Sequence, residues 1–264
     1  MYIHNIDPIL IDSEFLEIRW YSLAYIFGIL IGWWLGKKIL NFKIKYQKIS
    51  LRKDIFDDLI TYLIISIILG GRIGYILFYN LNYYINNPIS IFKIWEGGMS
   101  FHGGLLGVII GMWWFAKKNK INFFLFADII ATVAPIGLFF GRLANFINSE
   151  LYGHPTNVYW SVIFPKIDNI SRHPSQLYEA ILEGLLLFII LLPIAFSKKI
   201  INGLNSSLFL ILYGMFRIFS ERFREPDTQI GYLFNSVSMG TFLSLIMIIF
   251  GGLIFIKSKN ELFK

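Results

Sequence analysis

Seven apolar blocks, each about as long as a bilayer is thick, constrain this sequence more than any other feature. A helix needs roughly 20 apolar residues to cross the hydrocarbon core of a membrane. Only 16% of the residues are charged, whereas a soluble domain carries about 25%. We therefore predict an all-α membrane protein, a bundle of about seven transmembrane helices in a single integral-membrane domain of residues 1–264. The expected spans are about 20–39, 55–79, 99–116, 123–146, 176–196, 204–223 and 237–256.

Lysine and arginine residues follow alternate apolar blocks. Short cytoplasmic loops of membrane proteins carry an excess of these residues, so we assign the basic segments to the cytoplasmic side, with the amino terminus outside and the carboxy terminus inside. The net charge of +7 then reflects topology and contact with anionic membrane lipids, and we expect no binding of nucleic acid. The basic segments hold Lys37, Lys38, Lys43, Lys45, Lys48, Arg52, Lys53, Lys117, Lys118, Lys120, Lys198, Lys199, Lys257, Lys259 and Lys264.

Cysteine is absent from the chain, which excludes disulfides, thiolate nucleophiles and cysteine metal sites. No two of the four histidines lie at the spacing of metal ligands. We therefore expect neither a metal nor a cofactor. The first residues lack the basic start, apolar core and small-residue cleavage site of a signal peptide, and we do not expect one.

Glycines recur at intervals of four residues within the apolar blocks. Small residues at this spacing let helix backbones approach closely in lipid, so we predict helix packing at most of them. The longest segment on the outer side, residues 148–175, is polar, aromatic and interrupted by prolines, and is expected to form an ordered arm. The spaced glycines are Gly28, Gly32 and Gly36, then Gly70 and Gly74, then Gly103, Gly107 and Gly111.

Ionisable side chains inside the apolar blocks are candidates for function, because a charge in hydrocarbon is costly. Those that stand out gather toward the outer ends of the spans, in one leaflet. They are Arg72, His102, Arg142, Arg217, Glu221, Arg222 and Arg224.

The sixth block carries a polar stripe. Tyr213, Arg217, Glu221 and Arg224 follow one another at intervals of four, four and three residues, so they share one face of a helix. One interpretation is a structural ladder of Arg and Glu side chains that extend to the membrane interface. For Arg222 and Arg224 this interpretation and a functional role are equally compatible with the sequence. Arg217 lies more than a turn deeper, which favours a functional role.

The fourth block ends in "GRLANFINSELYG". Arg142 and Asn145 share a helix face, and Glu150 and Gly153 follow where the helix is expected to stop. An arginine fork for phosphate, an amide donor and a carboxylate to orient them would suit an anionic ligand. The alternative is a helix end with a snorkelling arginine.

His102 precedes two glycines at the start of the third block, in "SFHGGLLG". Glycines let a ligand approach the backbone, and a neutral imidazole can act as a general base near pH 7. The alternative is a buried histidine that bonds a carbonyl. Several arginines and a histidine in one leaflet indicate an enzyme or transporter of an anionic phospholipid, because arginine binds phosphate bidentately.

Five blocks of the sequence resemble the prolipoprotein diacylglyceryl transferase family, in that family's order. The resemblance covers roughly residues 20–240 and implies a multi-pass protein of the bacterial inner (cytoplasmic) membrane, with a periplasmic amino terminus and a small periplasmic arm or head. The blocks are "GGRIGYILFYN", "WEGGMSFHGGLLG", "GRLANFINSELYG", "RHPSQLYEA" and "YGMFRIFSERFREPD".

The resemblance implies transfer of the diacylglyceryl group of phosphatidylglycerol to the lipobox cysteine in the signal peptide of a prolipoprotein. It implies that Arg142 and Arg217 clamp the phosphate and that His102 takes or relays the thiol proton, although a carboxylate or the lipid phosphate could do so instead. On the family pattern the catalytic residues are Tyr21, His102, Arg142, Asn145, Glu150 and Arg217. Those that bind phosphatidylglycerol are Arg142, Asn145, Gly153, Tyr213, Arg217, Glu221 and Arg224.

Two departures from the family pattern are visible. Ser22 follows Tyr21 where the family commonly has glycine, and the arm between Gly153 and Arg172 is short compared with larger members of the family. Two other classes stay open from the residues alone. A lipid flippase or scramblase would place polar groups through the midplane, and a seven-span receptor or assembly factor would not need arginines that converge on one leaflet.

Overall fold

The computed structural model describes residues 2–13, 16–47, 49–52, 54–93, 97–199, 201–225, 232–233 and 237–262. The chain forms two compact units, which are described separately. Unit 1 contains residues 1–47 and 128–264, and unit 2 contains residues 48–127. The predicted single membrane domain is not tested by this division and stays a prediction.

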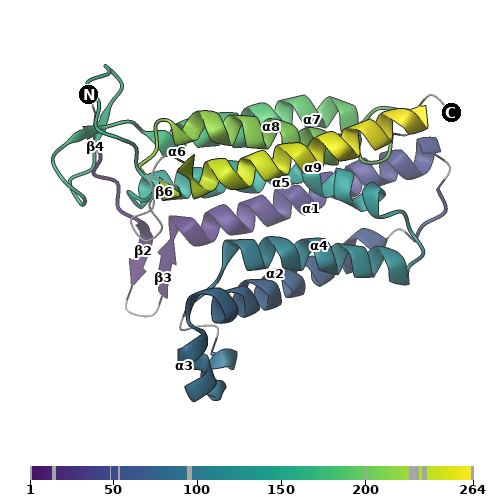
Figure 1. The fold of residues 1–264 in the computed structure, drawn as a ribbon, viewed down its shortest axis with the longest axis horizontal. Helices are drawn as coiled ribbons and strands as arrows, with labels where there is room; N and C mark the ends of the chain where they lie inside the picture. The colour runs from purple at the N-terminus through teal and green to yellow at the C-terminus, as the bar shows by residue number, and fades with distance from the viewer. Residues whose placement is uncertain are drawn as a thin grey trace. The chain divides into compact units, whose positions relative to one another are not determined.

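Unit 1 is built from long helices (Figure 1). They are α1 (Trp20–Gln47), α5 (Phe123–Ile147, which begins in unit 2), α6 (Ser175–Glu179), the π-helix η3 (Ala180–Leu186), α7 (Leu187–Ala195), α8 (Leu204–Glu221) and α9 (Met239–Leu262). The elements α6, η3 and α7 follow one another without a break. Helices α8 and α9 lie side by side, and Gly214 lets α9 approach, because a Cβ atom there would lie 2.8 Å from the carbonyl oxygen of Ser244.

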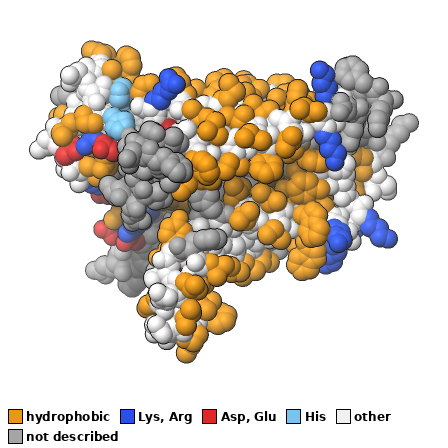
Figure 2. Space-filling model, viewed as in Figure 1, with side chains coloured by type: hydrophobic (Ala, Val, Ile, Leu, Met, Phe, Trp, Pro, Cys, Tyr) orange, Lys and Arg blue, Asp and Glu red, His pale blue; other side chains and the backbone are white. Residues whose placement is uncertain are grey.

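Apolar side chains point outward from these helices. On α9 the side chains of Ile249, Leu253 and Ile256 are 60–62% exposed, and Figure 2 shows hydrophobic side chains along the flank of this helix. Large exposed apolar surfaces of this kind are normal only where lipid or a partner covers them. Five described segments are long and apolar enough to span a membrane, namely Trp20–Tyr46, Ile55–Leu77, Phe123–Ile147, Ser175–Ala195 and Met239–Lys259.

The prediction of an all-α membrane protein is therefore confirmed. Each of the seven expected spans corresponds to a helical segment. Helices α4 and α8 have 18 residues each and are not among the five candidate spans, so the number of crossings stays a prediction.

The basic segments of unit 1 meet at one end of the helices. The rings of Phe42 and Phe196 lie 5.3 Å apart, and the ammonium group of Lys198 lies 5.1 Å from the ring of Tyr46. The Ser258 hydroxyl donates to the carbonyl oxygen of Asn202 at 2.7 Å. These contacts bring together the ends of α1, α7 and α9 that carry lysines, as the charge pattern predicts for one membrane side.

Asp128 lies in the same part of unit 1 and was not singled out from the sequence. Its carboxylate is buried and accepts the backbone N–H groups of Gly203 at 2.8 Å and Ser206 at 2.9 Å, and the Ser206 hydroxyl at 2.7 Å. Helices leave their first N–H groups without intrahelical partners. Asp128 therefore closes the start of α8 from a neighbouring helix, which is a structural role.

Short strands order the outer segments of unit 1. The strands β1 (Tyr2–Ile3), β4 (Val162–Ile163) and β5 (Ser171–Arg172) form one sheet. The central strand β4 pairs with β1 in parallel and with β5 in antiparallel orientation. Two hairpins pair β2 (Ile9–Ser13) with β3 (Leu16–Arg19) and β6 (Tyr232–Leu233) with β7 (Val237–Ser238). The expected arm at residues 148–175 is thus ordered by a sheet that includes the amino-terminal strand.

Unit 2 is a helix pair with a short appendage. It contains α2 (Ile55–Tyr79), α3 (Leu81–Asn86), the 3-10 helix η1 (Pro88–Phe92) and α4 (Phe101–Lys118). Helices α2 and α4 meet through the predicted glycines. A Cβ atom on Gly107 would lie 2.1 Å from the carbonyl oxygen of Ser66, and one on Gly103 would lie 2.3 Å from that of Gly70. The packing role that the glycine spacing predicts is confirmed for this pair.

A matched pair of alanine substitutions on α4 tests this packing. We expect Gly107→Ala to lower the melting temperature of the protein in detergent, because overpacking costs about 1–3 kcal/mol. Gly104→Ala is the control, since its Cβ atom would lie 3.7 Å from the nearest atom and both variants gain the same helix propensity. Equal melting temperatures for the two variants would show that α2 and α4 do not need the close approach.

Candidate functional site

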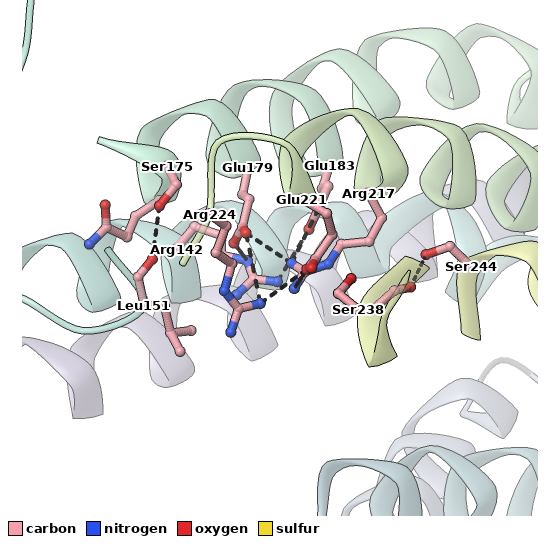
Figure 3. A network of polar contacts seen from close by, with 12 residues as sticks. Arg142, Leu151, Ser175, Glu179, Glu183, Arg217, Glu221, Arg224, Ser238 and Ser244 are labelled. Atoms are coloured by element: carbon pink, nitrogen blue, oxygen red, sulfur yellow. Dashed lines mark hydrogen bonds and ion pairs between the residues drawn. The ribbon is translucent and has the colours of Figure 1, made fainter. Parts of the chain in front are cut away.

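Three arginines and three glutamates form one ionic cluster in unit 1 (Figure 3). Arg142 comes from α5, Arg217 and Glu221 from α8, and Arg224 from the segment after α8. The other two members, Glu179 and Glu183, lie on α6 and η3. Figure 3 shows these side chains pointing toward one another from separate helices.

Glu179 lies at the centre of the ionic cluster. Its Oε2 atom is 2.9 Å from Nε of Arg142, and its Oε1 atom is 3.0 Å from Nη1 of Arg217. The same Oε1 atom is 4.0 Å from Nη1 of Arg224. A single carboxylate thus holds guanidinium groups from two distant parts of the chain.

The other two carboxylates complete the cluster. Glu183 lies 3.2 Å from Nη2 of Arg142 and 3.5 Å from Nη1 of Arg217. Glu221 lies 2.5 Å from Nη2 of Arg217 and 3.5 Å from Nη1 of Arg224. Arg217 therefore contacts all three glutamates.

The cluster is removed from solvent. The side chains of Glu179 and Glu183 are 0% exposed, those of Arg217 and Arg142 9% and 15%. Buried charges need partners of opposite sign, and three arginines facing three glutamates balance formally to zero. Because charges attract strongly in a low-dielectric interior, the cluster holds its guanidinium groups in fixed positions.

The π-helical turn of η3 carries one of the two central carboxylates. Turns of this kind widen a helix by one residue and are frequent at functional sites. Gly184 lets the turn pack against α5, since a Cβ atom there would lie 2.7 Å from Cα of Phe139. Close contact between η3 and α5 brings Glu183 within reach of Arg142.

A second polar group begins one turn beyond Arg142 on α5. The Asn145 amide donates to the Tyr21 hydroxyl and to Oε2 of Glu150, both at 3.2 Å. The Gln176 amide donates to the Glu150 backbone carbonyl at 2.6 Å. The structure thus brings together Tyr21, Asn145 and Glu150, from α1, α5 and the segment after α5, as predicted site residues.

Gly153 connects the arm to the end of α8. It forms a β-bridge with Arg224, and a Cβ atom there would lie 2.5 Å from the carbonyl oxygens of both His173 and Phe223. Arg172 stabilises the same contact between the arm and the segment after α8. Its Nη1 atom donates to the Gly153 carbonyl oxygen at 3.1 Å and lies 2.5 Å from the carboxylate of Glu225. Any side chain at position 153 would push the backbone around Arg224 away from the cluster.

The two predicted site residues that remain are Tyr213 on α8 and His102 on α4. Tyr213 lies one turn before Arg217 on α8, and its ring stacks on Phe209 with centroids 5.6 Å apart. His102 is the second residue of α4 in unit 2, and its side chain lies outside the described residues. The convergence of this imidazole with the arginines stays a prediction.

A family model of prolipoprotein diacylglyceryl transferase matches residues 8–257. The chain belongs to this family. It is 52% identical to the phosphatidylglycerol–prolipoprotein diacylglyceryl transferase of Rickettsia felis over 259 residues, 97% of this chain and 98% of that protein. It is also 52% identical to the protein of that name from Rickettsia bellii (strain OSU 85-389) over 257 residues, 97% of this chain and 96% of that protein. The resemblance of the five blocks is thereby confirmed, and the chain is a multi-pass membrane enzyme, a diacylglyceryl transferase.

Sequence reasoning missed the two central carboxylates of this transferase. Glu179 and Glu183 lie four residues apart in the fifth apolar block, where paired ionisable residues in a membrane span are themselves a signal of function. Among the residues that the structure describes, no group of three or more histidines, aspartates and glutamates is placed to hold a metal ion. The absence of a metal and of a cofactor stays an expectation.

Proposed function

We propose that this transferase moves the diacylglyceryl group of phosphatidylglycerol to the thiol of the lipobox cysteine in a prolipoprotein signal peptide. The names of the relatives contain both phosphatidylglycerol and prolipoprotein, and family membership supports diacylglyceryl transfer. The reaction forms a carbon–sulfur bond at the glyceryl C3 carbon and breaks the bond from that carbon to the phosphate oxygen. Glycerol phosphate leaves, and the thiol comes from the substrate because this chain has no cysteine.

The observation that carries this proposal is the convergence of Arg142 and Arg217 on Glu179, at 2.9 and 3.0 Å. Two guanidinium groups fixed by one carboxylate form a site for a phosphate, because arginine presents planar N–H donors to its oxygens. The leaving phosphate carries more negative charge than the phosphodiester. Preorganised donors stabilise such developing charge strongly.

The remaining residues take supporting roles in this proposal. Tyr21, Asn145 and Glu150 form one hydrogen-bonded group that orients the headgroup beside Arg142. Tyr213, Glu221 and Arg224 position Arg217 and the phosphate, while Gly153 holds the backbone at Arg224 in place. His102 takes the thiol proton as a general base, which yields the thiolate that attacks the saturated carbon. A carboxylate or the lipid phosphate is the alternative acceptor.

We further propose that the enzyme lies in the bacterial inner membrane with its amino terminus in the periplasm. The basic ends of α1, α7 and α9 support a cytoplasmic position for that side of unit 1. The ionic cluster lies toward the opposite ends of α5 and α8, so the reaction takes place at the outer leaflet. Membrane lipids are the expected surroundings of the whole chain, and nucleic acid is not an expected partner.

Mass spectrometry of a lipobox peptide tests the proposed reaction. The purified protein is incubated with phosphatidylglycerol vesicles and the peptide, and we expect the peptide to gain the mass of one diacylglyceryl group. A peptide in which serine replaces the cysteine is the control and should not change. Headgroup movement between leaflets without a thioether product would instead indicate a flippase.

A further inference from the structure

We propose that residues Leu81–Phe92, the segment of α3 and η1, form a membrane-interface platform that lies in the lipid headgroup region where α2 ends. This inference concerns unit 2 alone and goes beyond the proposed function. The platform would interact with lipid, and no protein partner is needed to cover it.

The platform turns its apolar side chains outward. Ile85, Ile89 and Phe92 are 66%, 75% and 78% exposed, whereas Tyr84 and Ser90 are only 7% and 8% exposed. The three asparagines of the segment are exposed as well, so it presents large apolar side chains and polar amides together, which suits the boundary between hydrocarbon and water. Figure 2 shows the hydrophobic side chains that gather in the region of α3. Something apolar must therefore cover this surface.

Continuity with the surface of α2 identifies lipid as the cover. Leu69, Ile73 and Leu77 of α2 are 53–56% exposed, which is the lipid-facing surface of a candidate span. Beyond the break at Asn80, Leu81, Ile85 and Ile89 are exposed as well, at 43%, 66% and 75%. Exposed apolar side chains thus follow one another along the chain from the end of the candidate span into the platform.

The composition of the platform suits the interface between hydrocarbon and water. Residues 81–92 contain no lysine, arginine, aspartate or glutamate. The rings of Tyr75 and Tyr79 stack with centroids 5.5 Å apart, and the rings of Tyr83 and Tyr84 lie 5.1 Å apart just beyond them. Tyrosine is enriched at this depth because its ring is apolar and its hydroxyl is polar. Amphipathic segments of this type lie in the plane of the interface.

Arg72 fixes the platform to α2. Its buried guanidinium donates to the carbonyl oxygens of Ser90 at 2.5 Å and of Ile91 and Lys93 at 3.0 Å. It also lies 5.1 Å from the ring of Tyr84. An arginine that was a functional candidate from the sequence therefore has a structural role in unit 2.

The same guanidinium reaches the turn that leads to α4. It donates to the carbonyl oxygens of Gly97 and, at 3.3 Å, Gly98, two glycines with φ of +85° and +79°. Ser100 follows, donates its N–H to the Gly71 carbonyl oxygen at 2.9 Å, and caps α4 by accepting from Gly103 at 3.2 Å. These hydrogen bonds connect the platform, through Arg72 of α2, to the start of α4.

Depth-dependent fluorescence quenching tests the platform in the intact protein. Because the chain has no cysteine, Ile89→Cys carries a single bimane label, and the protein is reconstituted into phosphatidylglycerol and phosphatidylcholine vesicles. We expect stronger quenching of this label by lipids with a nitroxide near the headgroup than by lipids with a nitroxide near the chain end. Ile73→Cys, two turns inside α2, should show the reverse order, and Lys199→Cys should respond to aqueous iodide.

Two results would overturn the platform. A label at position 89 that iodide quenches and lipid nitroxides do not would place the segment in water. A label shielded from both quenchers would mean that protein covers the surface. As a check on folding, the double variant Ile85→Glu with Ile89→Glu should keep the wild-type melting temperature in detergent, since both side chains are largely exposed, and should move a label at position 92 toward iodide.

Discussion

Arg142→Ala is expected to lower the rate of diacylglyceryl transfer at least about a hundredfold, which is the cost of removing one preorganised donor from a developing charge. The same substitution leaves Glu179 and Glu183 without the guanidinium that lies 2.9 and 3.2 Å away. An uncompensated charge in a buried ion pair costs about 3–5 kcal/mol. We therefore expect the melting temperature of this variant to fall as well, so that activity alone cannot define the role of Arg142.

Arg142→Lys separates the two effects. Lysine keeps the positive charge between Glu179 and Glu183, and we expect it to restore much of the melting temperature. It lacks the planar fork that binds two phosphate oxygens, so transfer should stay far below the wild-type rate. The measurement is kcat/KM for phosphatidylglycerol with a lipobox peptide, together with thermal unfolding in detergent. Near-normal turnover by the lysine variant would contradict a bidentate phosphate clamp at this position.

The helices and the polar face of α8 could be predicted because their signals are local. Apolar blocks of spanning length give the helices directly. The spacing of Tyr213, Arg217 and Glu221 places one polar stripe on α8, and the structure shows Arg217 and Glu221 in contact at 2.5 Å. The prediction that Arg224 continues this helix face was wrong, because α8 ends at Glu221, although Arg224 still lies 3.5 Å from that carboxylate. The glycine interval likewise predicts close helix packing at Gly103 and Gly107, although it does not say which helix packs there. Each of these inferences needs only the geometry of a single helix.

The partners of the arginines could not be predicted in the same way. Arg142 and Arg217 belong to different helices, and nothing in their own segments shows that both approach Glu179. Similarly, Arg72 and Arg217 both look like costly charges within apolar blocks, yet Arg72 bonds backbone carbonyls of its own unit. Such pairings depend on how the helices pack against one another, and the residue spacing within a single helix carries no information about its neighbours.

The charge balance of the ionic cluster leads to the second large expected effect. Three arginines and three glutamates sum to zero, so a bound phosphodiester would make the site net negative. Glu179→Gln removes one negative charge at nearly constant shape. The site is then net positive when empty and neutral when phosphate is bound. On Coulombic grounds this variant should bind phosphatidylglycerol at least as tightly as the wild type.

Transfer by Glu179→Gln should nevertheless fall about a hundredfold, because a displacement of roughly 1 Å in a positioning group can cost that much. The expected signature is a strongly reduced kcat with a KM for phosphatidylglycerol that is unchanged or lower. Glu225→Gln is the matched control: its carboxylate pairs with Arg172 in the arm at 2.5 Å but is 40% exposed, and exposed pairs contribute only about 0–1 kcal/mol. It should leave both constants close to those of the wild type. A raised KM with unchanged kcat in Glu179→Gln would mean that this carboxylate serves lipid binding and does not hold the two guanidinium groups for the reaction.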